Sequence, residues 1–206
     1  MSAGIRFVYS ARIESLIQLF IFKSNHFHLM HGELIENRIV IWDIKKSKEL
    51  FSESYYGKPI GMAKPKPEEI DVPLILDLIE GHYLQEKDQL VINSAKKKIT
   101  KMQLLEICRK EYHNFDKKYQ VYKDFRDKNY IVNPGIKFGC DFAVYQRGPG
   151  IDHAPYLVQV HNKTDSVTST SVVLAGRLAT SVKKHFILAI PGSNKVNYLA
   201  LDWWRA

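Results

Sequence analysis

Short stretches rich in apolar, β-branched and aromatic residues follow one another in the second half of the chain, which is the pattern of β-strands. Four stretches carry this pattern: residues 137–145, 156–161, 186–190 and 196–203. Between the second and the third, apolar residues recur at helical spacing, so a helix is expected from about residue 171 to residue 185. The second half therefore predicts a sheet with helices packed against it.

The first half mixes the two periods. Residues 33–42 alternate as a strand does, and residues 72–85 place apolar side chains at helical spacing. Thr100 and Gln103 have the spacing of a capping box, which predicts a helix beginning after Thr100. Asn114 is expected to cap a further helix.

That last helix carries an aromatic stripe, which is more typical of a protein core than of a base-stacking surface; its members are Phe115, Tyr119, Tyr122 and Phe125. The change from mixed elements to strands puts the domain boundary near residues 108–115. We expect an α+β fold with an extension over residues 1–29, an N-terminal α/β domain over 30–110, and a C-terminal domain over 111–206. The apolar run at residues 16–22 is too short to cross a bilayer, which takes about 20 apolar residues.

The composition is that of a folded, basic protein. Hydrophobic residues make up 45% of the 206 and the formal net charge is +8, which suits a polyanionic partner. Residues 94–130 hold eleven Lys or Arg against five Asp or Glu, so +6 of the +8 lies in this stretch. Solvated helix faces would explain that charge equally well. Cys108 and Cys140 lie in apolar segments, which predicts buried, reduced thiols and a cytoplasmic location.

A phenol, an imidazole and an ammonium are the groups that metal-free cleavage of an RNA phosphodiester needs, and three motifs of the second half offer one of each. Tyr145 closes the run Lys-Phe-Gly-Cys-Asp-Phe-Ala-Val-Tyr, His153 begins His-Ala-Pro-Tyr-Leu-Val, and Lys184 ends Arg-Leu-Ala-Thr-Ser-Val-Lys-Lys. Such cleavage needs one group that removes a proton, one that donates a proton, and a cation that stabilises the phosphorane. A free phenol has a pKa of about 10, and neighbouring cations favour the phenolate.

In order and in spacing, these motifs resemble the catalytic core of the tRNA-splicing endonucleases. The resemblance covers roughly residues 31–206 and is strongest over 130–190. It implies that Tyr145 is the general base on the ribose 2′-hydroxyl, that His153 is the general acid on the 5′-oxygen, and that Lys184 supports the transition state. The implied substrate is precursor tRNA, the implied products are a 2′,3′-cyclic phosphate and a 5′-hydroxyl, and no metal or cofactor is required.

The resemblance also implies residues that bind RNA. The family clamps a flipped bulge base between two arginines, for which the candidates here are Arg177 and Arg205. Arg177 and Lys184 are seven residues apart, so on one helix they would share a face. The loop over residues 61–69 resembles a lysine-bearing loop of one archaeal branch that widens the substrate range, and its Lys64 and Lys66 are candidate phosphate contacts. An ordinary solvated loop would explain the two lysines equally well.

A missing charge predicts a partner. In the family, an acidic loop between the last two strands enters a basic pocket of a neighbouring subunit. The corresponding turn here, residues 191–195, reads Pro-Gly-Ser-Asn-Lys and holds no acid. We therefore expect a separate structural subunit with an acidic loop, in an assembly of two catalytic and two structural chains. The apolar strand over residues 196–203 is expected to be an open edge through which the chain self-associates.

Two other functions remain open from the residues. Asp141 on a strand that is followed by a second strand has the outline of a metal-dependent restriction-type nuclease. The second strand reads Gln-Val-His-Asn-Lys over residues 159–163, without the acid that such a site needs. The chain is alternatively an RNA-binding or structural subunit of the same complex, although its three catalytic candidates are all present.

Overall fold

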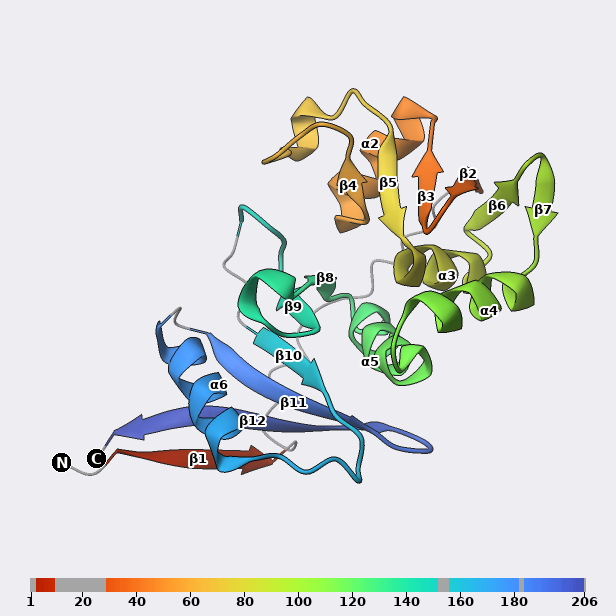
Figure 1. Ribbon diagram of the computed structural model, residues 1–206. Coiled ribbons are helices and arrows are strands. Elements are labelled where there is room, and N and C mark those ends of the chain that lie inside the picture. Colours follow the sequence, from red (N-terminus) through yellow and green to blue (C-terminus); the bar gives the residue numbers. More distant parts are fainter. Residues whose placement is uncertain (1–2, 10–28, 152–155, 182–183, 206) are drawn as a thin grey trace. The chain divides into compact units, whose positions relative to one another are not determined.

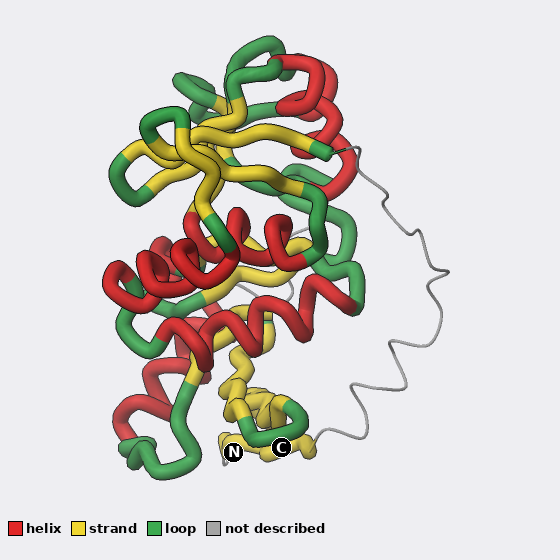
Figure 2. The backbone as a smooth tube through the Cα atoms, turned by 90° about the vertical axis from the view of Figure 1, so that its right-hand side faces the viewer, coloured by secondary structure: helices red, strands yellow, loops and turns green. Residues whose placement is uncertain are grey.

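The protein has an α+β fold with two six-stranded sheets, as expected from the sequence. The computed structural model describes residues 3–9, 29–151, 156–181 and 184–205. The described chain divides into two compact units, each with one sheet and its own helices (Figures 1 and 2). One unit covers the described residues from 29 to Asp116. The other holds strand β1 and the described chain from Lys117 onwards.

The sheet of the first unit has the strand order β4-β5-β3-β2-β6-β7. Strands β2 and β6 pair in parallel, and the other neighbours are antiparallel. Its strands are β2 (Met30–Ile35), β3 (Arg38–Ile41), β4 (Lys58–Pro59), β5 (Leu74–Asp77), β6 (Leu90–Ser94) and β7 (Lys97–Ile99). Its helices are α2 (Ile44–Ser54), the short η1 (Pro67–Glu69), α3 (Leu78–Glu86) and α4 (Lys101–Glu111).

Two expectations for this unit are wrong in detail. The single strand expected over residues 33–42 is a hairpin of β2 and β3, turned at Glu36, whose φ is +53°. The helix expected over 72–85 is strand β5 followed by α3, because the Asp77 side chain caps the helix and Glu80 completes a capping box. The capping box of Thr100 and Gln103 at the start of α4 is confirmed.

Gly81 explains how α3 packs so closely on the sheet. A β-carbon at this position would lie 2.1 Å from Cδ1 of Ile39 on β3, so a larger residue would require the Ile39 side chain or the helix to shift. Gly81 is a poor helix former, and its close approach to Ile39 accounts for its place in α3. α3 is buried nearly all round, with Leu78 and Leu84 fully inaccessible.

The sheet of the second unit has the order β1-β12-β11-β10-β9-β8. Strands β10 and β11 are parallel, joined by a crossover through α6, and the other neighbours are antiparallel. Its strands are β1 (Ala3–Tyr9), β8 (Ile131–Pro134), β9 (Phe142–Tyr145), β10 (Tyr156–Val160), β11 (His185–Pro191) and β12 (Val196–Arg205). Its helices are α5 (Phe115–Asp127), the short η2 (Ile136–Phe138) and α6 (Ser169–Ser181).

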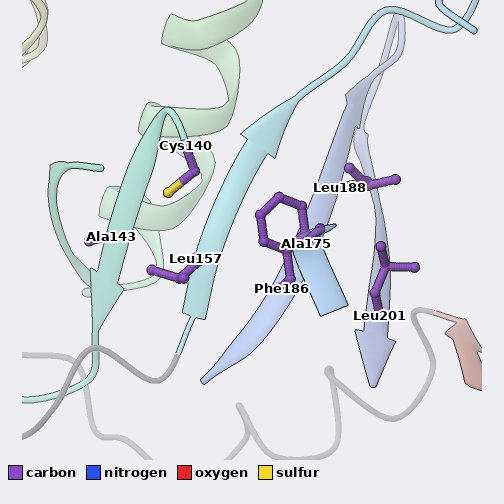
Figure 3. Packing of buried hydrophobic residues seen from close by; sticks show 7 residues of the cluster. All are labelled: Cys140, Ala143, Leu157, Ala175, Phe186, Leu188 and Leu201. Carbon is purple, nitrogen blue, oxygen red and sulfur yellow. The ribbon is translucent and has the colours of Figure 1, made fainter. Parts of the chain in front are cut away.

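Helices cover both faces of this sheet, as the alternation of side chains along its strands requires. On one face Ala175 of α6 joins a buried cluster, shown in Figure 3, with Cys140, Ala143, Leu157, Phe186, Leu188 and Leu201. On the other face the aromatic stripe of α5 packs against the strands: the ring centroids of Tyr122 and Phe142 are 6.1 Å apart, and those of Phe125 and Tyr198 are 5.2 Å apart. The stripe is therefore core, as expected.

The C-terminal strand does not have the open edge that the sequence predicts. β12 pairs with β11 on one side and with β1 on the other, in an antiparallel register from Ala3 opposite Arg205 to Tyr9 opposite Leu199 (Figure 1). Sequence reasoning treated residues 1–29 as an extension of uncertain status and found no strand there. Because β1 occupies the hydrogen-bonding groups of this edge, the expectation that β12 is an open edge is wrong, while self-association of the chain stays a prediction.

Both cysteines are buried and neither forms a disulfide, as predicted. Burial raises the pKa of the Cys108 thiol to about 12 and that of Cys140 to about 11. Both thiols thus stay protonated and unreactive at neutral pH. Among the described helices, none is both long enough and apolar enough to cross a membrane.

Candidate active site

The topology of the second sheet brings several candidate residues to one of its ends. Val144, Tyr156 and His185 lie side by side on β9, β10 and β11. β9 runs towards this end while β10 and β11 start from it, so Tyr145 and Lys184 each lie one residue beyond that row. They are two strand spacings apart, which is about 10 Å between backbones.

The connection between β9 and β10 also lies at this end. It begins after Tyr145 and turns at Gly148-Pro149-Gly150-Ile151, where the Ile151 N–H donates to the Gly148 carbonyl over 3.2 Å. Proline fits the second position of such a turn, and the φ of +87° at Gly150 suits the third position only for glycine or asparagine. His153 follows two residues after Ile151. It lies outside the described residues, but both ends of its connection belong to this end of the sheet.

Lys184 is not on the helix that the sequence predicts for it. α6 ends at Ser181, and Lys184 immediately precedes β11, so the inference that Lys184 and Arg177 share a helix face is wrong. The half-buried Lys184 places its Nζ 5.5 Å from the centroid of the Phe138 ring. This cation–π contact orients the ammonium group. Phe138 and Tyr145 also pack against the same buried cluster.

The two arginine candidates approach the same end by different routes. α6 crosses back over the sheet between β10 and β11, so its C-terminal end lies where β11 begins, and the exposed Arg177 is about one turn from that end (Figure 1). β12 is antiparallel to β11 with Leu201 opposite Phe186, so continuing the register puts Arg205 two residues beyond the level of Lys184. Arg205 is thus located by its backbone register only.

Another phenol at this end is unsuited to act as a base. Tyr130 directly precedes β8, and its ring centroid is 6.3 Å from that of Tyr156. Burial, and then the neighbouring Tyr156, raise the pKa of Tyr130 above its ordinary value, so its hydroxyl stays protonated.

Asp141, the acid of the alternative metal site, belongs to the opposite end of β9. It is about four residues, or roughly 13 Å, from Tyr145 along the strand. Its carboxylate pairs with Lys118 at 2.8 Å and accepts hydrogen bonds from the Gln159 side chain at 2.7 Å and from the Val160 N–H at 2.8 Å. These contacts tie the start of β9 to the end of β10, which is a structural role for this carboxylate.

The loop that carries Lys64 and Lys66 is exposed, as expected. Both lysines are exposed, but Lys66 is held by Glu69: its Nζ lies 2.9 Å from Glu69 Oε1, and this pairing raises the pKa of the Lys66 ammonium. No ion pair or hydrogen bond joins the Lys64 ammonium to another described residue. The two lysines that the sequence treats as equivalent are therefore different in their surroundings.

Comparison with known proteins places these features in a family. The N-terminal domain of the tRNA intron endonucleases matches residues 30–105, and their catalytic C-terminal domain matches residues 115–198. Together the two matches cover well over half of the chain. The chain belongs to the tRNA intron endonuclease family. The matched catalytic domain contains Tyr145, His153, Arg177 and Lys184.

Curated relatives of the family extend the similarity over nearly their whole lengths. The proteins named tRNA-splicing endonuclease from Sulfurisphaera tokodaii and Hyperthermus butylicus are 42% and 38% identical over 179 and 178 residues. The one from Pyrobaculum arsenaticum is 40% identical over 182 residues. In each case 85% of this chain is covered, and 98–100% of the relative. All three relatives are archaeal.

The sequence alone indicated no role for Phe138. The residue lies within the quoted run that ends at Tyr145, but only the tertiary structure shows that its ring supports Lys184. The only signal in the sequence is its place next to Gly139, which ends a short 3-10 turn in the left-handed conformation. The contact between Phe138 and Lys184 could not be predicted from their spacing in the sequence.

Proposed function

We propose that this chain is the catalytic subunit of a tRNA-splicing endonuclease that cuts precursor tRNA at exon–intron junctions of the bulge–helix–bulge type. One observation carries the proposal: sheet topology brings Tyr145, Lys184 and the connection that contains His153 to the same end of one sheet. Residues 111–206 are the proposed catalytic domain and 30–110 the N-terminal domain. The two reduced thiols support a cytoplasmic location.

The proposed reaction is an internal transfer within the RNA. The Tyr145 phenolate takes the proton of the ribose 2′-hydroxyl, and the 2′-oxygen attacks the neighbouring phosphorus. As the bond between phosphorus and the 5′-oxygen breaks, the His153 imidazolium gives its proton to the leaving oxygen. The Lys184 ammonium stabilises the charge of the phosphorane. The products are a 2′,3′-cyclic phosphate and a 5′-hydroxyl, with no metal ion needed.

Arg177 and Arg205 are proposed to hold a base of the bulge. A guanidinium is planar and stacks on a base as it does on an aromatic side chain. The exposure of Arg177 near the C-terminal end of α6 leaves its side chain accessible to an RNA that occupies this end of the sheet.

The decisive experiment is cleavage of a bulge–helix–bulge RNA by the assembled enzyme in EDTA. Because the proposed base, acid and cation are all side chains, we expect the cleavage rate to be unchanged, and the ends to be a 2′,3′-cyclic phosphate and a 5′-hydroxyl, identified by phosphatase and kinase labelling. Loss of cleavage in EDTA, or 5′-phosphate ends, would instead support a metal-dependent nuclease. Full activity of an assembly whose Tyr145, His153 and Lys184 are all replaced by Ala would make this chain the non-catalytic subunit.

The exposed loop is proposed to contact RNA mainly through Lys64. Lys64→Ala is expected to slow cleavage of irregular bulged substrates about fivefold, as for one exposed contact worth on the order of 1 kcal/mol. Lys66→Ala is expected to have a smaller effect, because Glu69 already neutralises Lys66. Lys45→Ala, at another exposed position, is the control. Unchanged rates for the variant lacking both Lys64 and Lys66 would show that the loop makes no such contact.

A further inference from the structure

Part of the positive charge of residues 94–130 is neutralised within the fold. Four of its eleven cations pair with carboxylates at 2.6–2.9 Å: Lys101 with Asp88, Arg109 with Asp116, Lys118 with Asp141, and Lys128 with Asp124. Arg126 is buried and donates to the Tyr122 hydroxyl over 3.0 Å. Much of the basic stretch that the sequence singles out is therefore structural.

Three of the other six cations lie together at one hairpin. Lys96, Lys97 and Lys98 are consecutive and exposed, and no ion pair or hydrogen bond joins their ammonium groups to another residue that the structure describes. They belong to the hairpin of β6 and β7, in which Ser94 pairs with Lys97. The hairpin projects at one edge of the first unit's sheet, because β7 is the terminal strand (Figure 1).

The turn of this hairpin keeps a lysine where glycine would fit better. Its two central residues, Ala95 and Lys96, have φ values of +47° and +64°. Two-residue hairpin turns of this conformation favour Asn-Gly or Asp-Gly, because other residues adopt a positive φ only at a conformational cost. Backbone strain of this kind is commonly kept where the side chain has a function.

Protection of a sheet edge does not account for all three lysines. A lysine on a terminal strand keeps other strands from pairing with it, and Lys97 and Lys98 meet that need. Lys96 lies in the turn and is not part of the β7 ladder, so it contributes nothing to blocking the edge. Three unpaired ammonium groups around a hairpin tip instead match a polyanion whose charges recur along a strand.

We infer that the hairpin tip Lys96-Lys97-Lys98 is a second RNA-binding surface, which contacts backbone phosphates of the precursor RNA other than the scissile one. The inference rests on the proposed function for its substrate. The tip belongs to the unit that holds none of the proposed catalytic residues. Lysine ammonium groups bind phosphates as point charges without reading sequence, so the surface adds affinity and leaves the choice of cleavage site to the bulges.

The test uses the assembled enzyme with a variant that keeps the hairpin folded. In Lys96→Asn, Lys97→Thr and Lys98→Gln, asparagine suits the left-handed turn and threonine suits the strand, while three charges are lost. Binding is measured to a bulge–helix–bulge RNA with 2′-deoxy substitutions at the junctions, which cannot be cleaved. The control loses three exposed lysines elsewhere in the same unit, through Lys45→Ala, Lys58→Ala and Lys110→Ala.

If the tip contacts three phosphates, the slope of log binding constant against log salt falls in magnitude by about 2–3 for the hairpin variant. Its loss of affinity relative to the wild type should therefore shrink by about 40-fold between 50 and 200 mM salt. The control should keep the wild-type slope, and cleavage at saturating RNA should be unchanged in both.

The possible failures are distinguishable. If the wild-type assembly does not cleave the unmodified RNA, the proposed function fails. If it cleaves but the hairpin variant keeps the wild-type affinity and slope, the inference alone is wrong. A change in the mass of the assembly with an unchanged slope would show that the tip binds a protein subunit, and would also overturn the inference.

Discussion

Replacing His153 by Ala is expected to lower the single-turnover cleavage rate of the assembled enzyme by about 10²–10⁴, which is the usual contribution of a general acid. Without the imidazolium, the 5′-oxygen must leave as an alkoxide or take its proton from water. The limb of the pH–rate profile that reports the protonated general acid should also disappear. Single-turnover kinetics with saturating enzyme measure the chemical step alone.

A modified substrate distinguishes the role of the general acid, His153, from that of the general base, Tyr145. When sulfur replaces the 5′-oxygen at the junction, the leaving group needs no proton, so the His153→Ala variant should regain nearly the wild-type rate. Tyr145→Phe should stay slow on that substrate, because removal of the 2′-proton is still required. The phenylalanine ring preserves the packing of Tyr145 against the buried cluster, so the variant tests the hydroxyl alone.

His31→Ala is the matched control, since this exposed histidine belongs to β2 in the other unit. It should leave the rate unchanged. Equal recovery of the His153 and Tyr145 variants on the sulfur substrate would contradict the assigned roles, as would a rate loss for His153→Ala of less than about tenfold.

Elements that carry their own local signals were predictable from the sequence. The capping box at Thr100 marks the start of α4, and short apolar runs mark β10, β11 and β12. The β2–β3 hairpin was read as one strand because its turn at Glu36 lacks glycine and proline, the usual turn residues. Strand β5 was merged into a helix because its short apolar run, Leu74 to Leu76, fits both periods.

The candidate site was predictable in its residues but not in its geometry. The motifs around Tyr145 and Lys184 identify which residues to examine, whereas only the parallel pairing of β10 and β11 brings them to one end of the sheet. Lys184 was assigned to a helix because the apolar pattern of α6 continues past Ser181, where the helix ends. Long-range pairing also determines that β12 is not an edge strand. Its partner β1 is 190 residues or more away in the sequence, so local patterns give no sign of the pairing.

This chain alone is expected to have little activity, and a subunit with an acidic loop between its last two strands should restore it. The turn between β11 and β12 is tight: the Gly192 N–H donates to the Lys195 carbonyl over 2.8 Å, and the Gln120 side chain donates to the Gly192 carbonyl over 2.9 Å. It carries the exposed Lys195 and no acid. Such a turn has no charge complementary to a basic pocket, so a proposed assembly of identical chains lacks that contact.

Cleavage of a bulge–helix–bulge RNA by the chain alone and with the partner, together with the mass of each species by light scattering, measures the effect. With two catalytic and two structural chains, activity should rise with added partner and reach its maximum at a ratio of one to one. We thus expect this chain to carry the catalytic residues and to need the partner subunit for activity.

A change of the turn itself tests the reason for this dependence. Both hydrogen bonds that hold the turn involve backbone groups of Gly192 and Lys195, so Ser193→Asp, Asn194→Asp and Lys195→Glu keep them while giving the turn three acids. If the missing charge is the cause, this variant should show more activity without a partner than the wild type, and Ser193→Asn, Asn194→Gln and Lys195→Gln should not. Full activity of the unmodified chain as a homo-oligomer would overturn the argument, because an acid-free turn would then suffice for assembly.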